Sequence, residues 1–339
     1  METSIDLKVD KMNRRNFISS AIGASALAMT PFNLRGAIPT QAPMKIGIIG
    51  LDTSHSPAFA KYFNQTNTSG KFKVVAAYPY GSKEIESSAS RIPKYTEEVK
   101  QYGVQIVDSI KKLLDDVDAV LLETNDGRLH KDQAFQVIKA RKPLFVDKPV
   151  AASMADVIAI YSEAKKSNVP IFSSSSLRYM ETAQSVRYKD AIGKVLGADT
   201  FSPATLEPTH PDLFWYGIHG VEILFTVMGP GCESVTRFNK DNVDVVVGVW
   251  KDGRIGTFRG TREGKHDYGG TAYGSKGNLV LGPFNGYDAL SEKIADFFTA
   301  KKSPVDDAET IEIYAFMEAA HQSSKRNGAS VRLAEVAKW

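Results

Sequence analysis

Short apolar segments alternate with longer segments of helical periodicity between residues 44 and 175. The apolar segments predict buried strands, at 44–49, 72–77, 119–122, 144–146 and 171–172. The segments between them predict helices, at 56–64, around His130, and after Ser153, where Met154, Val157, Ile158 and Tyr161 recur at helical spacing. Ser153 and Asp156 also have the spacing of a helix cap. This alternation predicts an α/β fold with a doubly wound parallel sheet.

The pattern changes after Ser176, where strands of alternating polarity come in pairs. Residues 243–250 and 254–259 flank an Asp252–Gly253 turn, and residues 271–273 and 278–281 flank a second turn, which predicts two antiparallel hairpins. Helices are predicted over 215–228 and 306–324. We therefore expect a Rossmann-like domain over 44–175 and an α+β domain with an open, mainly antiparallel sheet over 176–339.

Composition supports a globular chain with two cores. The sequence has 339 residues, of which 42% are hydrophobic and 24% charged. This length is more than one packed core usually fills. The net charge of +3 is too small to recruit nucleic acid or an anionic membrane.

The first 36 residues predict a targeting segment rather than part of the fold. The paired arginines Arg14 and Arg15 precede a weakly apolar run from Ile18 to Met29, which is too short and too polar to span a bilayer stably. This pattern resembles a twin-arginine signal, so we expect export of the folded protein to the periplasm. The alternative is a disordered basic tail. The single cysteine, Cys232, excludes an internal disulfide.

Polar residues gather where the predicted strands 119–122 and 144–146 end. Because the carboxyl ends of parallel strands share one edge, the Thr124–His130 loop and the Asp147–Lys148–Pro149 tip should face one crevice. A lysine at such a strand tip is a candidate for chemistry. The alternative is a solvated surface lysine followed by a turn proline.

Several of these features together resemble the glucose-fructose oxidoreductase and inositol dehydrogenase (Gfo/Idh/MocA) family. They are the Asn125–His130 loop, its spacing to Asp147–Lys148–Pro149, the Ser176–Tyr179 segment, His219, the Gly274–Gly277 turn and the closing helix. The likeness extends over about 44–333. It implies a nicotinamide cofactor in the first domain and a sugar, polyol or related molecule against the open sheet of the second.

The resemblance implies Lys148 and His219 as the proton-handling pair. Transfer of a hydride from a carbinol carbon requires loss of the hydroxyl proton, so a base must lie within hydrogen-bond reach of that oxygen. The implied cofactor-binding residues are Gly50, Asp52, Thr53, Ser54, His55, Ser82, Lys83, Thr124, Asn125, His130, Asp147, Lys148 and Pro149. The implied substrate-binding residues are Arg178, Tyr179, Trp215 and Tyr216.

The phosphate-binding loop departs from the Gly-x-Gly-x-x-Gly pattern. Only Gly50 remains, and Asp52 stands where the middle glycine lets the backbone approach a pyrophosphate. Hydroxyls of Thr53 and Ser54 can contact phosphate instead. No acid follows the second strand, and Ser82 with Lys83 suits a 2′-phosphate, which slightly favours NADP over NAD. The altered loop also leaves loss of the cofactor as an alternative.

The surroundings of His219 depart from the family as well. Trp215 replaces the aspartate that often stands four residues earlier, which leaves Asp212 or Glu222 as candidates to orient the imidazole; the alternative is an incidental pair, which i to i+3 residues on a helix more often form. The set His210, Asp212, His219 and Glu222 can also be interpreted as metal ligands. No spacing among them is diagnostic for zinc, so no metal is predicted.

The sequence thus predicts an exported NAD(P)-dependent oxidoreductase acting on a sugar or sugar derivative. Two rivals are an NAD-dependent glycosidase-like enzyme whose cofactor does not dissociate, and a cofactor-free sugar-binding or assembly protein on the same fold. Because an open sheet face usually pairs with something, a homodimer or homotetramer is expected.

Overall fold

The computed structural model describes residues 42–265 and 267–337. The expected signal segment over 1–36 lies outside the described residues. Among the described residues, no helix has both the length and the apolar character needed to cross a bilayer.

The first half of the described chain forms a six-stranded parallel sheet, which confirms the predicted fold class. Its strand order is β3-β2-β1-β4-β5-β6. The strands are β1 (Met44–Ile49), β2 (Phe72–Tyr78), β3 (Gln105–Ile106), β4 (Ala119–Leu122), β5 (Leu144–Val146) and β6 (Ile171–Phe172). Because β1 lies between β2 and β4, the strand order reverses there, and ligands bind outside the carboxyl ends of strands at such a point.

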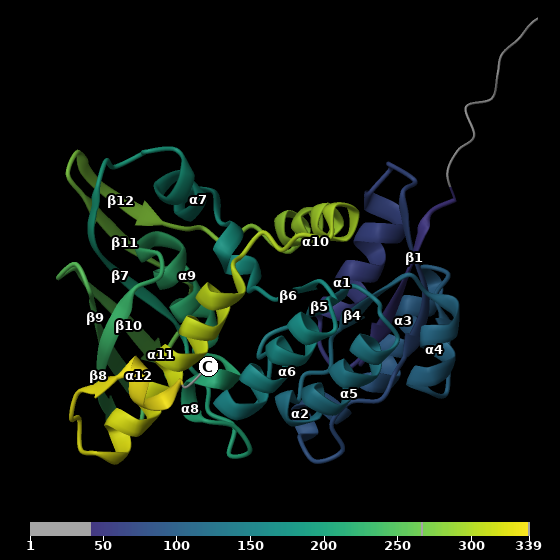
Figure 1. The fold of residues 1–339 in the computed structure, drawn as a ribbon, viewed down its shortest axis with the longest axis horizontal. Helices are drawn as coiled ribbons and strands as arrows, with labels where there is room; N and C mark the ends of the chain where they lie inside the picture. The colour runs from purple at the N-terminus through teal and green to yellow at the C-terminus, as the bar shows by residue number, and fades with distance from the viewer. Residues whose placement is uncertain (1–41, 266, 338–339) are drawn as a thin grey trace, which may run out of the picture. The chain divides into compact units, whose positions relative to one another are not determined.

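Helices connect the parallel strands (Figure 1). They are α1 (His55–Lys61), the π-helical turn η1 (Tyr62–Thr66), α2 (Glu86–Ala89), α3 (Ile92–Gln101), α4 (Ile110–Asp116), α5 (Gly127–Lys139) and α6 (Met154–Lys166). The Ser153 hydroxyl accepts a hydrogen bond from the Asp156 amide, as the sequence predicts. Asp126 caps α5 in the same way, through the Arg128 amide. The sequence did not predict β3, α2 or α3.

The second half forms a seven-stranded sheet in the order β12-β11-β7-β10-β9-β8-β13. The strands are β7 (Val195–Pro203), β8 (Cys232–Lys240), β9 (Val243–Trp250), β10 (Ile255–Thr261), β11 (Gly269–Gly274), β12 (Gly277–Leu281) and β13 (Val331–Arg332). Only β7 and β10 pair in parallel, so the sheet is mainly antiparallel as predicted.

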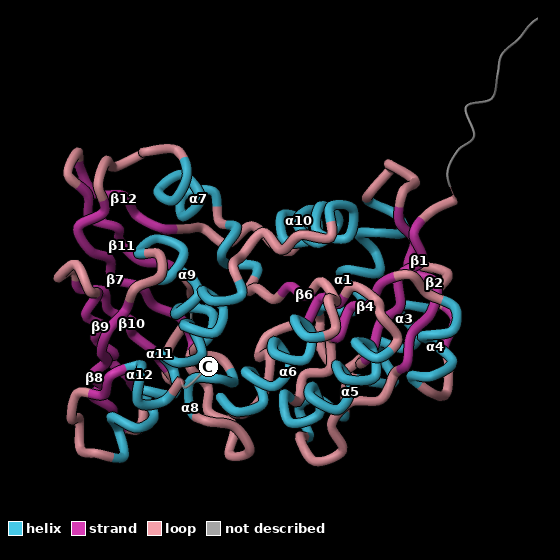
Figure 2. The backbone as a smooth tube through the Cα atoms, in the orientation of Figure 1, coloured by secondary structure: helices cyan, strands magenta, loops and turns pink. Residues whose placement is uncertain are grey.

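Helices pack on one face of this second sheet and leave the other face uncovered (Figure 2). The helices of this half are η2 (Ser176–Tyr179), α7 (Glu181–Tyr188), α8 (Asp212–Trp215), α9 (Ile218–Met228), α10 (Asp288–Ala300), α11 (Asp307–Lys325) and α12 (Leu333–Val336), of which α10 packs on the first half instead. The helix predicted over 215–228 is divided at Tyr216–Gly217 into α8 and α9. Every residue of α9 is buried, because it lies between the sheet and α11.

The two halves share buried surface. Leu290 and Phe298 of α10 belong to the same apolar cluster as Ile46 and Ile48 of β1. The Tyr314 hydroxyl of α11 accepts a hydrogen bond of 2.7 Å from the Val150 amide. All strands of the parallel sheet precede residue 175 and all strands of the second sheet follow it, but the domain boundary itself stays a prediction.

Candidate active site

A cavity of about 610 Å³ lies at the carboxyl ends of the parallel strands and is lined by residues of both halves. The first half contributes Thr53, Ser54, His55, Ser87, Arg91, Tyr95, Asn125 and Lys148. The second contributes Ser176, Leu177, Pro203, Thr205, Trp215, Tyr216, His219, Tyr268, Phe284 and Tyr287. Its size suits a small-molecule ligand.

Lys148 and His219 both line this cavity, although they are 71 positions apart in the sequence. Lys148 follows β5 directly after Asp147, and His219 lies in the first turn of α9. Both are largely buried, with 7% and 6% of their surface exposed. The strand tip and the helix therefore bring an ammonium and an imidazole to one chamber.

The ring orientation of His219 is fixed by Ser175. The Ser175 hydroxyl lies 2.8 Å from His219 Nδ1 and also accepts a hydrogen bond from the Leu177 amide. Because this oxygen already accepts from Leu177, its proton is best used toward Nδ1, which places the imidazole proton on Nε2. Burial lowers the pKa of His219 well below its usual value, and the charge of Lys148 adds to this effect, so the ring is neutral. The ring can then donate a hydrogen bond from Nε2.

Neither partner predicted for His219 reaches it. Glu222 instead accepts hydrogen bonds from Arg178 and Ser174. Asp212 forms an ion pair of 2.7 Å with Arg237. These ion pairs hold both carboxylates away from the imidazole, and the predicted roles of Asp212 and Glu222 are corrected accordingly.

The four residues considered as metal ligands are also kept apart by their own contacts. His210 accepts a hydrogen bond from the Gly127 amide at the start of α5, while Asp212, His219 and Glu222 have the partners given above. The group that could hold a metal ion among the described residues is a different one, His55, Glu123 and Asp147.

His55, Glu123 and Asp147 lie beside Lys148 and are almost completely buried. His55 Nδ1 is 2.8 Å from Asp147 Oδ2. Burial, reinforced by the charge of Asp147, raises the pKa of Glu123 well above its usual value. Although burial opposes ionisation of Asp147, the charges of His55 and Lys148 hold its pKa at about 2. Asp147 is therefore ionised near neutral pH, and Glu123 resists ionisation.

The structure turns Asp52 away from the cavity. Its carboxylate is fully buried and accepts hydrogen bonds from the amides of Ser82 (3.2 Å) and Asn125 (2.9 Å). Burial raises the pKa of Asp52 to about 6, against the lowering effect of these hydrogen bonds. A Cβ atom at Gly81 would lie 2.0 Å from Asp52 Oδ2, so only glycine leaves room there. Asp52 thus joins two loops and does not face a phosphate.

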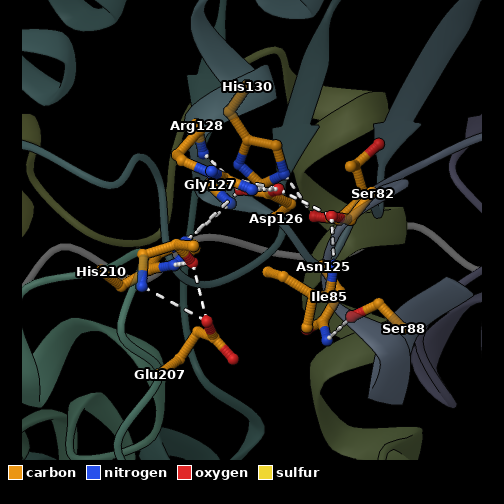
Figure 3. Close-up of polar contacts among 12 residues, drawn as sticks. Ser82, Ile85, Ser88, Asn125, Asp126, Gly127, Arg128, His130, Glu207 and His210 are labelled. Atoms are coloured by element: carbon orange, nitrogen blue, oxygen red, sulfur yellow. Dashed lines mark hydrogen bonds and ion pairs between the residues drawn. The ribbon is translucent and has the colours of Figure 1, made fainter.

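Polar contacts join the segment after β2 to the loop after β4 (Figure 3). The Ser82 hydroxyl donates a hydrogen bond of 2.9 Å to the Asp126 carboxylate, and the side-chain amide of Asn125 donates one of 2.8 Å to the Ser88 hydroxyl. Ser82 is therefore occupied internally, while Lys83 is exposed to solvent.

His130 is a structural support of the loop that follows β4. Its two ring nitrogens contact the carbonyl oxygens of Thr124 and Val150, and the ring is fully buried. It therefore joins the loop after β4 to the segment after Pro149, and it does not line the cavity.

The cavity wall carries hydrogen-bond donors of the kind that the phosphates of a nicotinamide dinucleotide need. Hydroxyls of Thr53, Ser54 and Ser87 and the guanidinium of Arg91 are among the groups that line the cavity. Such groups bind phosphate oxygens well. Sequence reasoning missed Ser87 and Arg91 because α2 and α3 carry no motif that points to the crevice.

The predicted substrate-binding residues divide into two pairs. Trp215 and Tyr216 line the cavity, but Arg178 and Tyr179 do not. Arg178 is buried between Glu222 and Glu309, with the latter at 2.8 Å, so its role is corrected to one of support.

The cavity is also lined by two aromatic residues that the sequence did not single out, Phe284 and Tyr287. The Tyr287 ring lies 4.6 Å from the His55 ring, measured between centroids. The Phe284 ring lies 5.8 Å from the Tyr287 ring. The hydroxyl of Tyr268, which also lines the cavity, is 3.4 Å from that of Tyr216. The segment that carries Phe284 and Tyr287 has no sequence signal, because its place depends on the long connection into α10.

Comparison with known proteins agrees with this architecture. Over 187 residues the chain is 24% identical to myo-inositol 2-dehydrogenase of Thermotoga maritima, a match that covers 48% of this chain and 56% of that relative. The chain therefore spans little more than half of the curated relative. Among solved structures, myo-inositol 2-dehydrogenase of Lactobacillus plantarum superposes with a TM-score of 0.70 at 16% identity, over 86% of this chain and 99% of that one. Scyllo-inositol dehydrogenase of Lactobacillus casei, solved with NAD(H) and scyllo-inositol, superposes with a TM-score of 0.68 at 15% identity, over 86% of this chain and 99% of that one.

The parallel sheet and its strand order define a Rossmann-like fold of the nucleotide-binding type. Residues 44–175 match the family described as "Oxidoreductase family, NAD-binding Rossmann fold". This match covers the parallel-sheet half of the chain and agrees with the resemblance to the Gfo/Idh/MocA family that the sequence motifs indicate.

Proposed function

We propose that this protein exchanges a hydride between a nicotinamide cofactor and a sugar or sugar derivative. The observation that carries the proposal is the convergence of Lys148 and His219, from separate halves of the chain, on one cavity. The inositol dehydrogenases among the similar proteins support a polyol or sugar as the substrate class.

The two residues divide the handling of the substrate oxygen between them. His219 donates a hydrogen bond from Nε2 to that oxygen, because its Nδ1 is occupied by Ser175. In its neutral amine form, Lys148 accepts the hydroxyl proton on Nζ during oxidation and becomes an ammonium, which returns the proton during reduction. The nicotinamide, when bound, supplies the hydride acceptor or donor. Trp215, Tyr216 and Tyr268 offer aromatic faces to the apolar face of a sugar ring.

The cofactor phosphates are assigned to the part of the cavity lined by Thr53, Ser54, Ser87 and Arg91. We keep the mild preference for NADP, which now rests on the exposed Lys83 and on Arg91, because Ser82 is bonded to Asp126. Lys83→Ala should therefore raise KM for NADP more than KM for NAD.

The proposal is tested by the nucleotide content and turnover of the purified protein. The protein is denatured, the released nucleotide is identified by mass spectrometry, and cofactor reduction is followed with inositols and hexoses. Bound nucleotide that turns over with free sugar supports the dehydrogenase. Bound nucleotide without net turnover supports the glycosidase-like rival. Absence of nucleotide, with no affinity for added NAD or NADP, contradicts the proposal.

Export through the twin-arginine route is proposed from Arg14, Arg15 and the apolar run that follows. Replacing both arginines with lysine should keep the protein in the cytoplasmic fraction. Unchanged recovery in the periplasmic fraction would contradict this part of the proposal.

A homo-oligomer is proposed from the uncovered face of the second sheet. Exposed apolar side chains on this face include Phe201, Phe238, Val249, Ile255 and Val280. A face of this kind on a folded protein is usually covered by a partner.

A further inference from the structure

Three buried side chains lie together at the ends of three neighbouring parallel strands. His55 begins the helix after β1, Glu123 directly follows β4, and Asp147 directly follows β5. Since β1, β4 and β5 are adjacent in the sheet, these side chains meet at the edge where ligands bind in such folds. One ligand atom of each lies within 4.8 Å of the others.

The carboxylates in this cluster lack the partners that burial demands. Both Glu123 oxygens and Asp147 Oδ1 have no hydrogen-bond partner, and the ammonium of Lys148 bonds to none of the three. Glu123 is fully buried and Asp147 is 1% exposed. A buried carboxylate without a donor or cation is costly, so buried oxygens without any partner are rare in native proteins.

A proton and a metal ion are the two simplest ways to satisfy the cluster. One proton shared by Glu123 and Asp147 satisfies one oxygen of each and leaves the other Glu123 oxygen without a partner. A divalent ion contacts both carboxylates and also a nitrogen of His55, which already points at Asp147 from 2.8 Å. The ion therefore accounts for more of the observed arrangement than the proton does.

We propose that His55, Glu123 and Asp147 form a binding site for a first-row divalent metal ion of the zinc class. One imidazole nitrogen with two carboxylate oxygens suits zinc, manganese or cobalt. Magnesium and calcium prefer six or more oxygen ligands, which this cluster does not offer.

The geometry agrees with such a site. Ligand atoms about 2.1 Å from a tetrahedral ion lie about 3.4 Å apart. Atoms now up to 4.8 Å apart therefore need to close by at most about 1.4 Å, and the His55–Asp147 pair, now 2.8 Å apart, needs to open by about 0.6 Å. His55 also lines the cavity, which gives the ion an entry path. The fourth coordination position can open toward the cavity, as in catalytic zinc sites. This inference concerns binding alone and does not depend on the proposed hydride transfer.

The test uses the full-length, tag-free protein. Metal content is measured by mass spectrometry after purification, and chelator-treated protein is then titrated with Zn²⁺ and with Co²⁺. We expect one ion per chain by calorimetry, and Co²⁺ absorption bands of the intensity typical of tetrahedral coordination. A folded, chelator-treated protein that binds neither ion stoichiometrically overturns the proposal.

Two variants locate the site, and a third is the matched control. Glu123→Gln and His55→Gln should each weaken Zn²⁺ binding by at least about a hundredfold. His321→Gln removes another histidine beside an aspartate, since His321 Nδ1 is 3.8 Å from Asp212. This control should leave affinity within about threefold. Circular dichroism checks that each variant folds, and if one does not, the other ligand variant decides the result. Binding that survives both ligand variants, or that is lost in His321→Gln, overturns the assignment.

Discussion

Single contacts decide which chemistry the cavity residues can perform. Ser175 is the clearest case, because its hydroxyl orients His219 without lining the cavity itself. It is a positioning residue, and its effect should reach the substrate only through the imidazole. This separation makes its contribution measurable.

Ser175→Ala should lower kcat about tenfold, because the imidazole loses the partner that selects its tautomer. KM for the cofactor should change less than about threefold, since Ser175 is not among the residues proposed to bind the cofactor phosphates. Steady-state kinetics measures both constants. Ser175→Thr keeps the hydroxyl and should restore most of the activity. Equal activity of the wild type and Ser175→Ala would show that the hydrogen bond has no catalytic role.

Residue types at strand ends could be predicted from the sequence, but their contacts could not. Lys148 follows a short apolar strand, so its place at the crevice follows from the alternation of strands and helices. The position of Asp52 depends on an amide 73 positions away, at Asn125. Arg178 has the type expected of a substrate ligand, yet Glu222 and Glu309 bury it. These outcomes depend on tertiary contacts that no local pattern encodes.

At the scale of elements, a loop of the second half is held on the first helix turn of α5. His210 Nε2 accepts a hydrogen bond of 3.1 Å from the Gly127 amide, a contact that requires the unprotonated nitrogen. Burial lowers the pKa of His210 to about 4, although Asp126 opposes this effect. In the unfolded chain the pKa is about 6.5. The folded state therefore binds the proton more weakly than the unfolded state does.

This difference predicts a loss of stability in acid. The contribution of His210 is complete above about pH 6.5 and declines as the pH falls toward 4, by about 2 kcal/mol after allowance for solvent screening. Urea denaturation at several pH values measures the free energy of unfolding. His210→Gln keeps an acceptor but does not titrate, so its stability should fall less over this range. If the free energy of unfolding falls equally with pH in the wild type and in His210→Gln, His210 is not the group responsible.

Helices and strands could be predicted where the pattern of apolar and polar residues extends over many positions, and could not where it extends over only a few. The hairpin of β9 and β10 follows from alternating polarity, and its observed register pairs Val246 with Phe258. The strand β3 has two residues and leaves no pattern. The break between α8 and α9 was missed because apolar residues continue through it from Phe214 to Ile218.

At the scale of the molecule, the second sheet has an outer face without helices. On β9, Val245, Val247 and Val249 point outward, while Val246 is buried. The neighbouring Ile255 on β10 is 53% exposed. A broad face of β-branched side chains is a favourable surface for a second copy of the chain.

Light scattering coupled to size exclusion should therefore give a mass that is a multiple of the 37.1 kDa chain. Val247→Glu places a charge in the middle of the face and should shift the mass toward one chain, because burying that charge is costly. Phe135→Glu, at an exposed apolar residue of α5, is the matched control and should leave the mass unchanged. A monomeric wild type at micromolar concentration would disprove the proposed association.

The whole account depends on Lys148 as the group that handles the substrate proton in the shared cavity. The most direct measurement compares the wild type with Lys148→Met, which keeps most of the side-chain volume and removes the ammonium. We predict that kcat falls by about a hundredfold or more, while nucleotide affinity stays within about tenfold, a difference of roughly 1.4 kcal/mol. Turnover by Lys148→Met at a rate near that of the wild type would contradict the account.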